Sequence, residues 1–160
     1  MIALGSRRVV HTGVTRHPTD AWVAQQLREA TPSSQRPRYL IRDRDRDREY
    51  GPAFARVAAA TGIEELRTAY RAPRQNGTCE RFLGSIRREC LDHLLILGEA
   101  HLRRVLREYT VSFNTARPHQ GLEQRIPDPG AVHARRAEAG GSVRSVPVLG
   151  SLHHMYRRAA

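Results

Sequence analysis

The chain has 160 residues and a formal net charge of +11, with 27 basic residues, all of them arginine, against 16 acidic ones. This excess favours a polyanionic partner. Cys79 and Cys90 are too few for a disulfide framework and wrongly spaced for zinc, which leaves core packing as their role. No apolar run approaches a membrane span and the N-terminus lacks a signal-peptide layout, so we expect no membrane partner and a cytoplasmic location.

The N-terminal stretch predicts a hairpin followed by a helix. Residues 1–15 alternate weakly around a turn at Gly5 and Ser6, which indicates the end of one strand, a tight hairpin and a second strand. Thr19 is the candidate N-cap of the helix that follows. One face of this helix is apolar and should be buried: Val23, Leu27 and Ala30.

A short apolar strand over 38–41 runs into a tract of alternating arginines and acids over 42–50. If this tract is extended, its period of two places Asp43, Asp45 and Asp47 on one face. The alternative is a charge-balanced, solvated loop. Carboxylates at the C-terminal end of a strand are also where the active sites of α/β folds gather.

Beyond the tract, the pattern predicts a helix over 51–61 that Gly62 stops, and a second short strand over 63–68. A basic loop over 69–76 then leads into the next helix. The order of these elements is that of a strand, a helix and a strand, with acids at the end of the first strand.

The stretch 75–90 is the centre of the prediction. Asn76 and Gly77 signal a turn, Thr78 is a candidate N-cap, and Glu80 lies in the first turn, where the helix dipole favours a carboxylate. An acid beside arginines suits a site that holds a metal ion against phosphate; the alternative is a surface helix with an ordinary glutamate. One stripe at helical spacing should be buried: Cys79, Phe82, Leu83, Ile86, Cys90 and Leu94.

The C-terminal half predicts one long amphipathic helix, which Pro118 terminates. Its apolar residues recur at helical spacing: Leu102, Val105, Leu106, Tyr109 and Phe113. Its other side carries three arginines: Arg103, Arg104 and Arg107. After it we expect a linker with a frayed helix over 127–141, a strand over 143–149 and a basic tail over 152–160.

An Asp that ends a strand, followed by a helix, a strand, a basic loop and a Glu that opens a helix, is the layout of a two-metal phosphoryl-transfer site. Two divalent ions held by carboxylates clamp the attacking and leaving oxygens of an in-line displacement. Mg²⁺ suits such a site because it prefers oxygen ligands and needs few from the protein.

With this layout the sequence resembles the integrase core of bacterial insertion-sequence (DDE) transposases, relatives of retroviral integrases with a ribonuclease H-like fold. The tail over 146–150, with His153, His154 and Tyr156, fits one branch of that group. Four segments carry the main resemblance, which extends over nearly the whole chain: 5–14, 39–54, 71–92 and 113–122.

The resemblance implies an Asp-Asp-Glu triad that uses Mg²⁺ or Mn²⁺ to cleave and join DNA strands through a 3′ hydroxyl. Asp45 matches the second Asp and Glu80 the Glu. Asp43 is the alternative to Asp45, because the Arg-Asp repeat is about one unit longer than the usual pattern. The resemblance, with ordinary surface as the alternative, also implies DNA contacts by eight residues: Arg71, Arg74, Asn76, Arg81, Arg87, Arg88, Arg117 and His119.

In this family the first Asp lies on a strand upstream of the hairpin, whereas the only acids before residue 43 here are Asp20 and Glu29. We therefore expect an N-terminally truncated α/β fold, a ribonuclease H-like mixed sheet flanked by helices that lacks its first, central strand. The partial core would span 1–127, with a linker and basic tail over 128–160.

Two functions remain open. The first is a truncated transposase core that is inactive alone, because its metal site lacks a ligand. The second is a non-catalytic fragment that binds DNA or interferes with a full-length transposase, or that associates with itself.

Overall fold

The computed structural model describes residues 1–32, 36–44, 49–70, 72–130 and 142–158, and it is a mixed α/β structure of helices and two small sheets. The chain divides into two compact units, one made of Met1 and Gly13–Arg81 and the other of Ile2–Thr12 and Phe82–Ala160. No helix among the described residues has the length and apolar character needed to cross a membrane.

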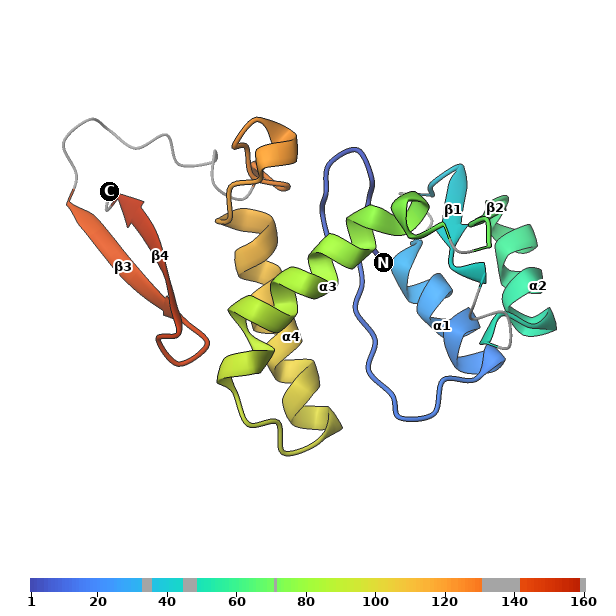
Figure 1. Cartoon of the computed structure of the whole chain (residues 1–160), viewed down its shortest axis with the longest axis horizontal. Helices are drawn as coiled ribbons and strands as arrows, with labels where there is room; N and C mark the ends of the chain where they lie inside the picture. Colours follow the sequence, from blue (N-terminus) through green and yellow to red (C-terminus); the bar gives the residue numbers. More distant parts are fainter. Residues whose placement is uncertain (33–35, 45–48, 71, 131–141, 159–160) are drawn as a thin grey trace. The chain divides into compact units, whose positions relative to one another are not determined.

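The first unit is a strand–helix–strand arrangement with one further helix (Figure 1). Strand β1 (Tyr39–Arg42) pairs in parallel with β2 (Glu64–Arg67), and α2 (Pro52–Thr61) makes the crossover that parallel strands require. Helix α1 (Asp20–Ala30) packs on α2. The core of the unit comes from both helices and the start of β2: Val23, Ala24, Leu27, Phe54, Val57, Ala58 and Ile63.

Sequence-local signals set the helix ends of this unit. The Thr19 hydroxyl accepts a hydrogen bond from the Trp22 amide, which confirms it as the cap of α1. Gly62 ends α2 in the left-handed conformation at φ 69°, which glycine adopts without a steric penalty. The N-cap of α2 is Gly51, which has no side chain to satisfy the first amides of the helix.

The Asp20 carboxylate replaces that missing cap. Its Oδ1 accepts hydrogen bonds from the amides of Gly51 (2.9 Å) and Phe54 (2.8 Å), and its Oδ2 accepts one from Ala53 (2.8 Å). Desolvation raises the pKa of Asp20, but these three donors outweigh it and hold the pKa below its ordinary value. Asp20 therefore joins the start of α1 to the start of α2.

The second unit contains α4 (Glu99–Thr115), a C-terminal hairpin and the N-terminal segment, together with α3 (Gly77–Glu89) from Phe82 onward. The hairpin pairs β3 (Val143–Val148) with β4 (His153–Arg158) in antiparallel register (Figure 1). Short 3₁₀ helices cover Pro73–Asn76 before α3, Leu91–His93 after it, and Gln120–Leu122 after α4. The core of this unit draws on each element: Val9, Ile86, Cys90, Val105, Tyr109, Phe113, Val148 and Leu149.

Asn114 attaches the N-terminal segment to α4. Its Oδ1 accepts a hydrogen bond from the Val9 amide and its Nδ2 donates one to the Val9 carbonyl, both at 2.9 Å and both buried. One amide side chain thus satisfies both backbone groups of a residue that is not in a regular strand. The same stretch makes a single antiparallel bridge, between Ile2 and Val9.

The structure confirms the four predicted helices and the strands at 39–42, 64–67 and 143–148. The predicted hairpin over 1–15 is confirmed only in part: a turn at 4–6 brings Ile2 and Val9 into an antiparallel bridge, and Ala3 exchanges backbone hydrogen bonds with Arg7 and Arg8, but no regular strands form. Thr78 is not an N-cap, since α3 already begins at Gly77. Leu83 is 56% exposed, so the predicted buried stripe is too wide.

Both cysteines are free thiols. Cys90 is fully buried, as predicted for a residue that packs in the core, whereas Cys79 is half-buried. Burial raises the pKa of each thiol. The basic tail beyond 152 pairs as a second strand, which the sequence pattern did not indicate. Most of the predicted linker, 131–141, lies outside the described residues.

Candidate metal-binding and DNA-binding site

Asp43 and Glu80, two of the predicted metal ligands, lie in the same unit of the structure. Asp43 directly follows the last residue of β1 and is half-buried, while Glu80 is exposed in the first turn of α3. Asp45, the preferred partner of Glu80, and Asp47 lie outside the described residues. In the part of the chain that is described, no three His, Cys, Asp or Glu side chains are grouped as a metal site.

The backbone on both sides of Asp43 is held by Thr68 and by Arg42, a buried arginine of β1. Its Nε donates to Glu65 Oε2 at 2.9 Å, and its guanidinium lies 4.6 Å from the centre of the Tyr50 ring. Its carbonyl accepts a hydrogen bond from the Thr68 amide, and the Thr68 hydroxyl accepts one from the Arg44 amide. The carboxyl end of β1 is therefore fastened to β2 on either side of the acid.

Glu80 owes its position to a tight turn before α3. Residues Pro73–Asn76 form a 3₁₀ turn, and the Gln75 side chain accepts a hydrogen bond from the Ala69 amide at 2.7 Å. This turn feeds directly into α3, and the Gly77 amide donates to the Arg74 carbonyl, so that Glu80 lies in the first turn, where the helix dipole favours a carboxylate. Carboxylate oxygens at such a position, like those of Asp43, are ligands that Mg²⁺ accepts.

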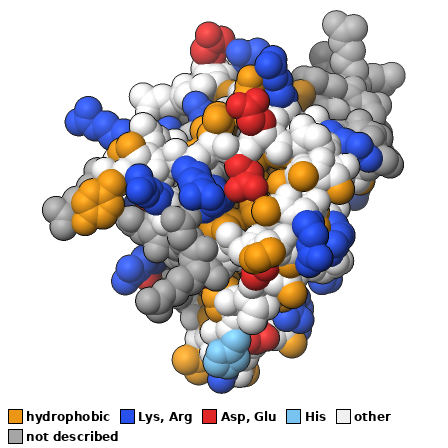
Figure 2. All heavy atoms as spheres, turned by 90° about the vertical axis from the view of Figure 1, so that its right-hand side faces the viewer, with side chains coloured by type: hydrophobic (Ala, Val, Ile, Leu, Met, Phe, Trp, Pro, Cys, Tyr) orange, Lys and Arg blue, Asp and Glu red, His pale blue; other side chains and the backbone are white. Residues whose placement is uncertain are grey.

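Four of the predicted DNA-contact arginines are exposed along this turn and helix: Arg74, Arg81, Arg87 and Arg88. A Cβ at Gly84 would lie 3.1 Å from Arg88 Nη1, so the glycine leaves space for that guanidinium. Asn76 is half-buried, and Arg71 lies outside the described residues. Acidic and arginine side chains are interspersed over the face drawn in Figure 2, so positive charge is not gathered in one patch there.

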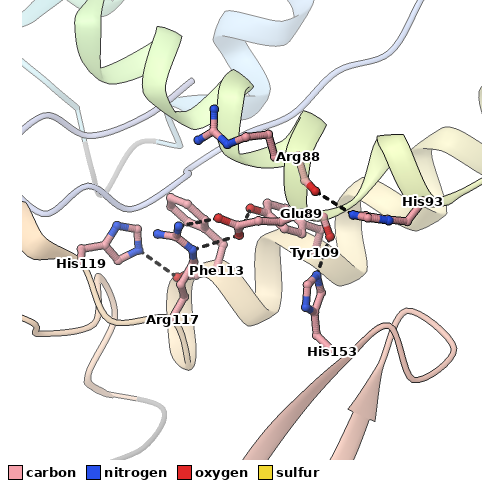
Figure 3. A network of polar contacts seen from close by, with 8 residues as sticks. All are labelled: Arg88, Glu89, His93, Tyr109, Phe113, Arg117, His119 and His153. Atoms are coloured by element: carbon pink, nitrogen blue, oxygen red, sulfur yellow. Dashed lines mark hydrogen bonds and ion pairs between the residues drawn. The ribbon is translucent and has the colours of Figure 1, made fainter.

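Arg117, another predicted DNA contact, instead binds a carboxylate of this chain. Its Nε and Nη2 donate to the two oxygens of Glu89 at 3.0 and 2.5 Å, and the Tyr109 hydroxyl donates to Glu89 Oε2 at 2.8 Å (Figure 3). Desolvation raises the pKa of Glu89, but Arg117 and Tyr109 outweigh it and lower the pKa below its usual value. Burial and the bond to Glu89 raise the pKa of Tyr109.

Two histidines satisfy the last carbonyls of α3. His93 Nε2 donates to the Arg88 carbonyl at 2.9 Å, and His153 Nε2, from β4, donates to the Glu89 carbonyl at 2.5 Å (Figure 3). The end of a helix leaves four carbonyls without partners, and cationic or polar donors there stabilise it. The end of α3 is thus bound to the 3₁₀ turn after it and to the C-terminal hairpin.

His119, the last predicted DNA contact, lies against Phe113. The two rings meet edge to face with centres 4.4 Å apart, and His119 Nε2 is 3.4 Å from the Phe113 carbonyl. Burial lowers the pKa of His119. Together with Asn114, these contacts show that the motif over 113–119 binds other parts of its own unit.

Glu89 and its partners were missed as a group by the sequence reasoning. Glu89 lies 28 positions before Arg117 and 64 before His153, and no periodic pattern spans such separations. The only signal in the sequence is an acid at the end of an arginine-rich helix, next to the buried Cys90.

Residues 61–127 match the family model described as "Integrase core domain". This range contains Glu80 and the contacts among Glu89, Tyr109 and Arg117, whereas Asp43 and Asp45 precede it. No curated protein and no solved structure matches the chain.

Proposed function

We propose that the chain, whose residues 61–127 match the integrase core domain model, is part of a transposase that performs metal-dependent DNA strand transfer. Glu80 is one metal ligand and Asp45 the second, with Asp43 as the alternative. The observation that carries the proposal is the position of Glu80: an exposed carboxylate within the matched range, at the start of a helix that presents arginines.

The donor set fits Mg²⁺ or Mn²⁺, because both ions prefer carboxylate and phosphate oxygens. When bound, such ions stabilise the charge on the attacking and leaving oxygens at phosphorus. The contribution of the chain itself is to present carboxylates from two separate elements. Arg42 holds the strand end beside Asp43, and the turn before α3 holds Glu80.

The DNA backbone is bound by the exposed arginines of the turn and helix, namely Arg74, Arg81, Arg87 and Arg88, together with Asn76. Arg71, which lies outside the described residues, is proposed as a further contact. A guanidinium can donate two parallel hydrogen bonds to one phosphate. Arg117 and His119 already bind groups of their own unit, so DNA would reach only the parts of these side chains left uncovered.

The fold proposed for the core is a ribonuclease H-like sheet over 1–127, followed by a linker and basic tail over 128–160. Residues 1–42 do not supply the third carboxylate of its triad. Asp20 uses both carboxylate oxygens to cap α2, and Glu29 lies on helix α1 rather than on a strand. The chain alone is therefore inactive in strand transfer, although it binds DNA.

The test is metal binding and strand joining by the purified chain. Glu80→Gln should abolish binding of Mn²⁺ as measured by calorimetry, whereas Glu99→Gln, which alters an acid in the first turn of α4, should leave it unchanged. Equal effects of the two variants would refute the assignment of Glu80. Robust joining of donor DNA ends by the unmodified chain would refute the claim that the third carboxylate is missing.

The second candidate function is a non-catalytic fragment that binds DNA or interferes with a complete transposase, by pairing with it or with another copy of itself. The observation that favours it is again the engagement of Asp20 in the cap of α2. Addition of the chain to a strand-transfer reaction run by an intact enzyme of this family should then slow it. An unchanged rate would exclude interference.

A further inference from the structure

A groove lies in the second unit between α4 and the C-terminal hairpin, with a volume of about 310 Å³. Its walls are packed firmly, because the Leu149 amide donates to the Glu108 carboxylate and both Val148 and Leu149 are buried in the core of the unit. Its floor is apolar and comes from α4, β3 and β4: Val111, Pro147, Val148 and Met155.

Two arginines of α4, Arg104 and Arg107, also line the groove, and both are exposed. Within the described residues neither guanidinium has a hydrogen-bond or ion-pair partner, whereas the neighbouring Arg103 pairs with Glu99 at 3.5 Å. The one acid of the groove, Glu108, directs an oxygen to the Leu149 amide. The groove therefore combines an apolar floor with two cationic groups that have no anion.

We propose that this groove binds a single-stranded segment of DNA, with one base on the apolar floor and the adjoining phosphates on Arg104 and Arg107. Single-strand sites combine a cationic groove for the backbone with side chains, typically aromatic, on which unstacked bases lie. In this groove the aliphatic floor and Met155 take the place of the aromatic side chains. Met155 suits such a floor, because its thioether makes favourable contacts with aromatic rings.

Size and polarity favour a single strand over a duplex. A volume of about 310 Å³ is at the lower end of ligand pockets, enough for one base but not for a stacked pair. In a duplex the bases are stacked and their faces are covered, so that the apolar floor would have no partner. The proposal rests on the proposed function for the identity of the nucleic acid, since strand cleavage and joining expose unpaired ends.

The experiment measures fluorescence anisotropy of the full chain with a labelled oligothymidylate of about ten nucleotides and with a duplex of equal length. The double variant Arg104→Gln, Arg107→Gln should weaken binding of the single strand about tenfold and reduce its salt dependence by about 1.4 in logarithmic slope, for two lost phosphate contacts. The matched control is Arg103→Gln, which alters the residue next to Arg104 that is already ion-paired with Glu99. It should change the affinity for the single strand less than about twofold.

A second variant separates groove binding from simple charge attraction. Val111→Lys adds a positive charge but places a polar chain over the floor, so binding through the groove predicts weaker binding of the single strand. Non-specific attraction predicts stronger binding instead, and that result would overturn the proposal. Val111 is 51% exposed, so the variant should fold.

The outcomes distinguish this site from the proposed function. The groove would be overturned if the double variant bound the single strand as tightly as Arg103→Gln does. If duplex binding survived in that case, the transposase proposal would remain intact. Single-strand binding that depends on Arg104, Arg107 and Val111 supports the groove even where Glu80→Gln fails its metal test. A decaglutamate peptide that displaces the oligonucleotide with equal affinity would show a protein partner and overturn the assignment to DNA.

Discussion

Glu80 and Glu89 lie on the same helix, α3, and differ in almost every respect. Glu80 is exposed in the first turn, and among the described residues its carboxylate has no hydrogen bond or ion pair. Glu89 is half-buried in the last turn, and its two oxygens accept three hydrogen bonds from Arg117 and Tyr109. A carboxylate whose two oxygens are hydrogen-bonded within its own chain, as in Glu89, contributes stability, whereas one without such partners can accept other ligands.

Removal of the Glu89 carboxylate, whose two oxygens are both hydrogen-bonded, should reduce stability most. Glu89→Ala should lower the free energy of unfolding by about 2 kcal/mol, because it leaves Arg117 and Tyr109 without their acceptor; partial exposure reduces the cost below that of a fully buried pair. Urea unfolding followed by circular dichroism measures it. Glu80→Ala is the matched control on the same helix and should change stability by less than about 0.5 kcal/mol. Equal losses would remove the distinction between the two glutamates.

A smaller loss should follow when one donor to Glu89 is removed. Tyr109→Phe keeps the buried ring but deletes the hydroxyl that bonds Glu89 Oε2, and we expect a loss of about 1 kcal/mol in the free energy of unfolding. In a Glu89→Ala background the same change should cost almost nothing, because the acceptor is already absent. Additive losses in this double-mutant cycle would contradict the hydrogen bond.

Acid should remove the stabilisation that the ionised Glu89 side chain provides. Its pKa is lowered in the folded state, so its contribution to stability is fully present above the unfolded value of 4.5 and is lost as the pH falls through the folded pKa. The difference in unfolding midpoint between the unmodified chain and Glu89→Gln should therefore narrow below pH of about 4. A difference that stays constant between neutral and acid pH would show that the ionised form is not the one stabilised.

We expect a still smaller effect at Asp20, the other carboxylate whose two oxygens are both hydrogen-bonded within the chain, which is half-buried. Asp20→Asn keeps one oxygen acceptor for the start of α2, so we expect a small loss of stability, below that of Tyr109→Phe, confined to the first unit. Hydrogen exchange at the amides of Gly51, Ala53 and Phe54 should quicken, whereas exchange in α4 should not. Faster exchange in both units would contradict a local capping role.

Helices and their ends were predictable because their signals are local. Thr19, Gly62 and Pro118 act through neighbours within one turn, and the spacing of Val105, Tyr109 and Phe113 correctly indicated the buried side of α4. Leu83 shows where this reasoning stops. It lies at the edge of an apolar stripe, and whether such an edge is covered depends on the partner surface rather than on the helix.

The amino-acid sequence alone indicated which segments are helical and that carboxylates follow β1 and open α3, and its residues 61–127 match the integrase core domain model. Which acids are hydrogen-bonded within the chain became clear from the packed structure alone. In that structure Asp20 accepts hydrogen bonds from the start of α2, Glu89 accepts them from Arg117 and Tyr109, and His153 donates one to the end of α3. The physical reason is range: helix propensity and capping depend on residues a few positions apart, whereas a carboxylate meets its partners only after distant segments have packed.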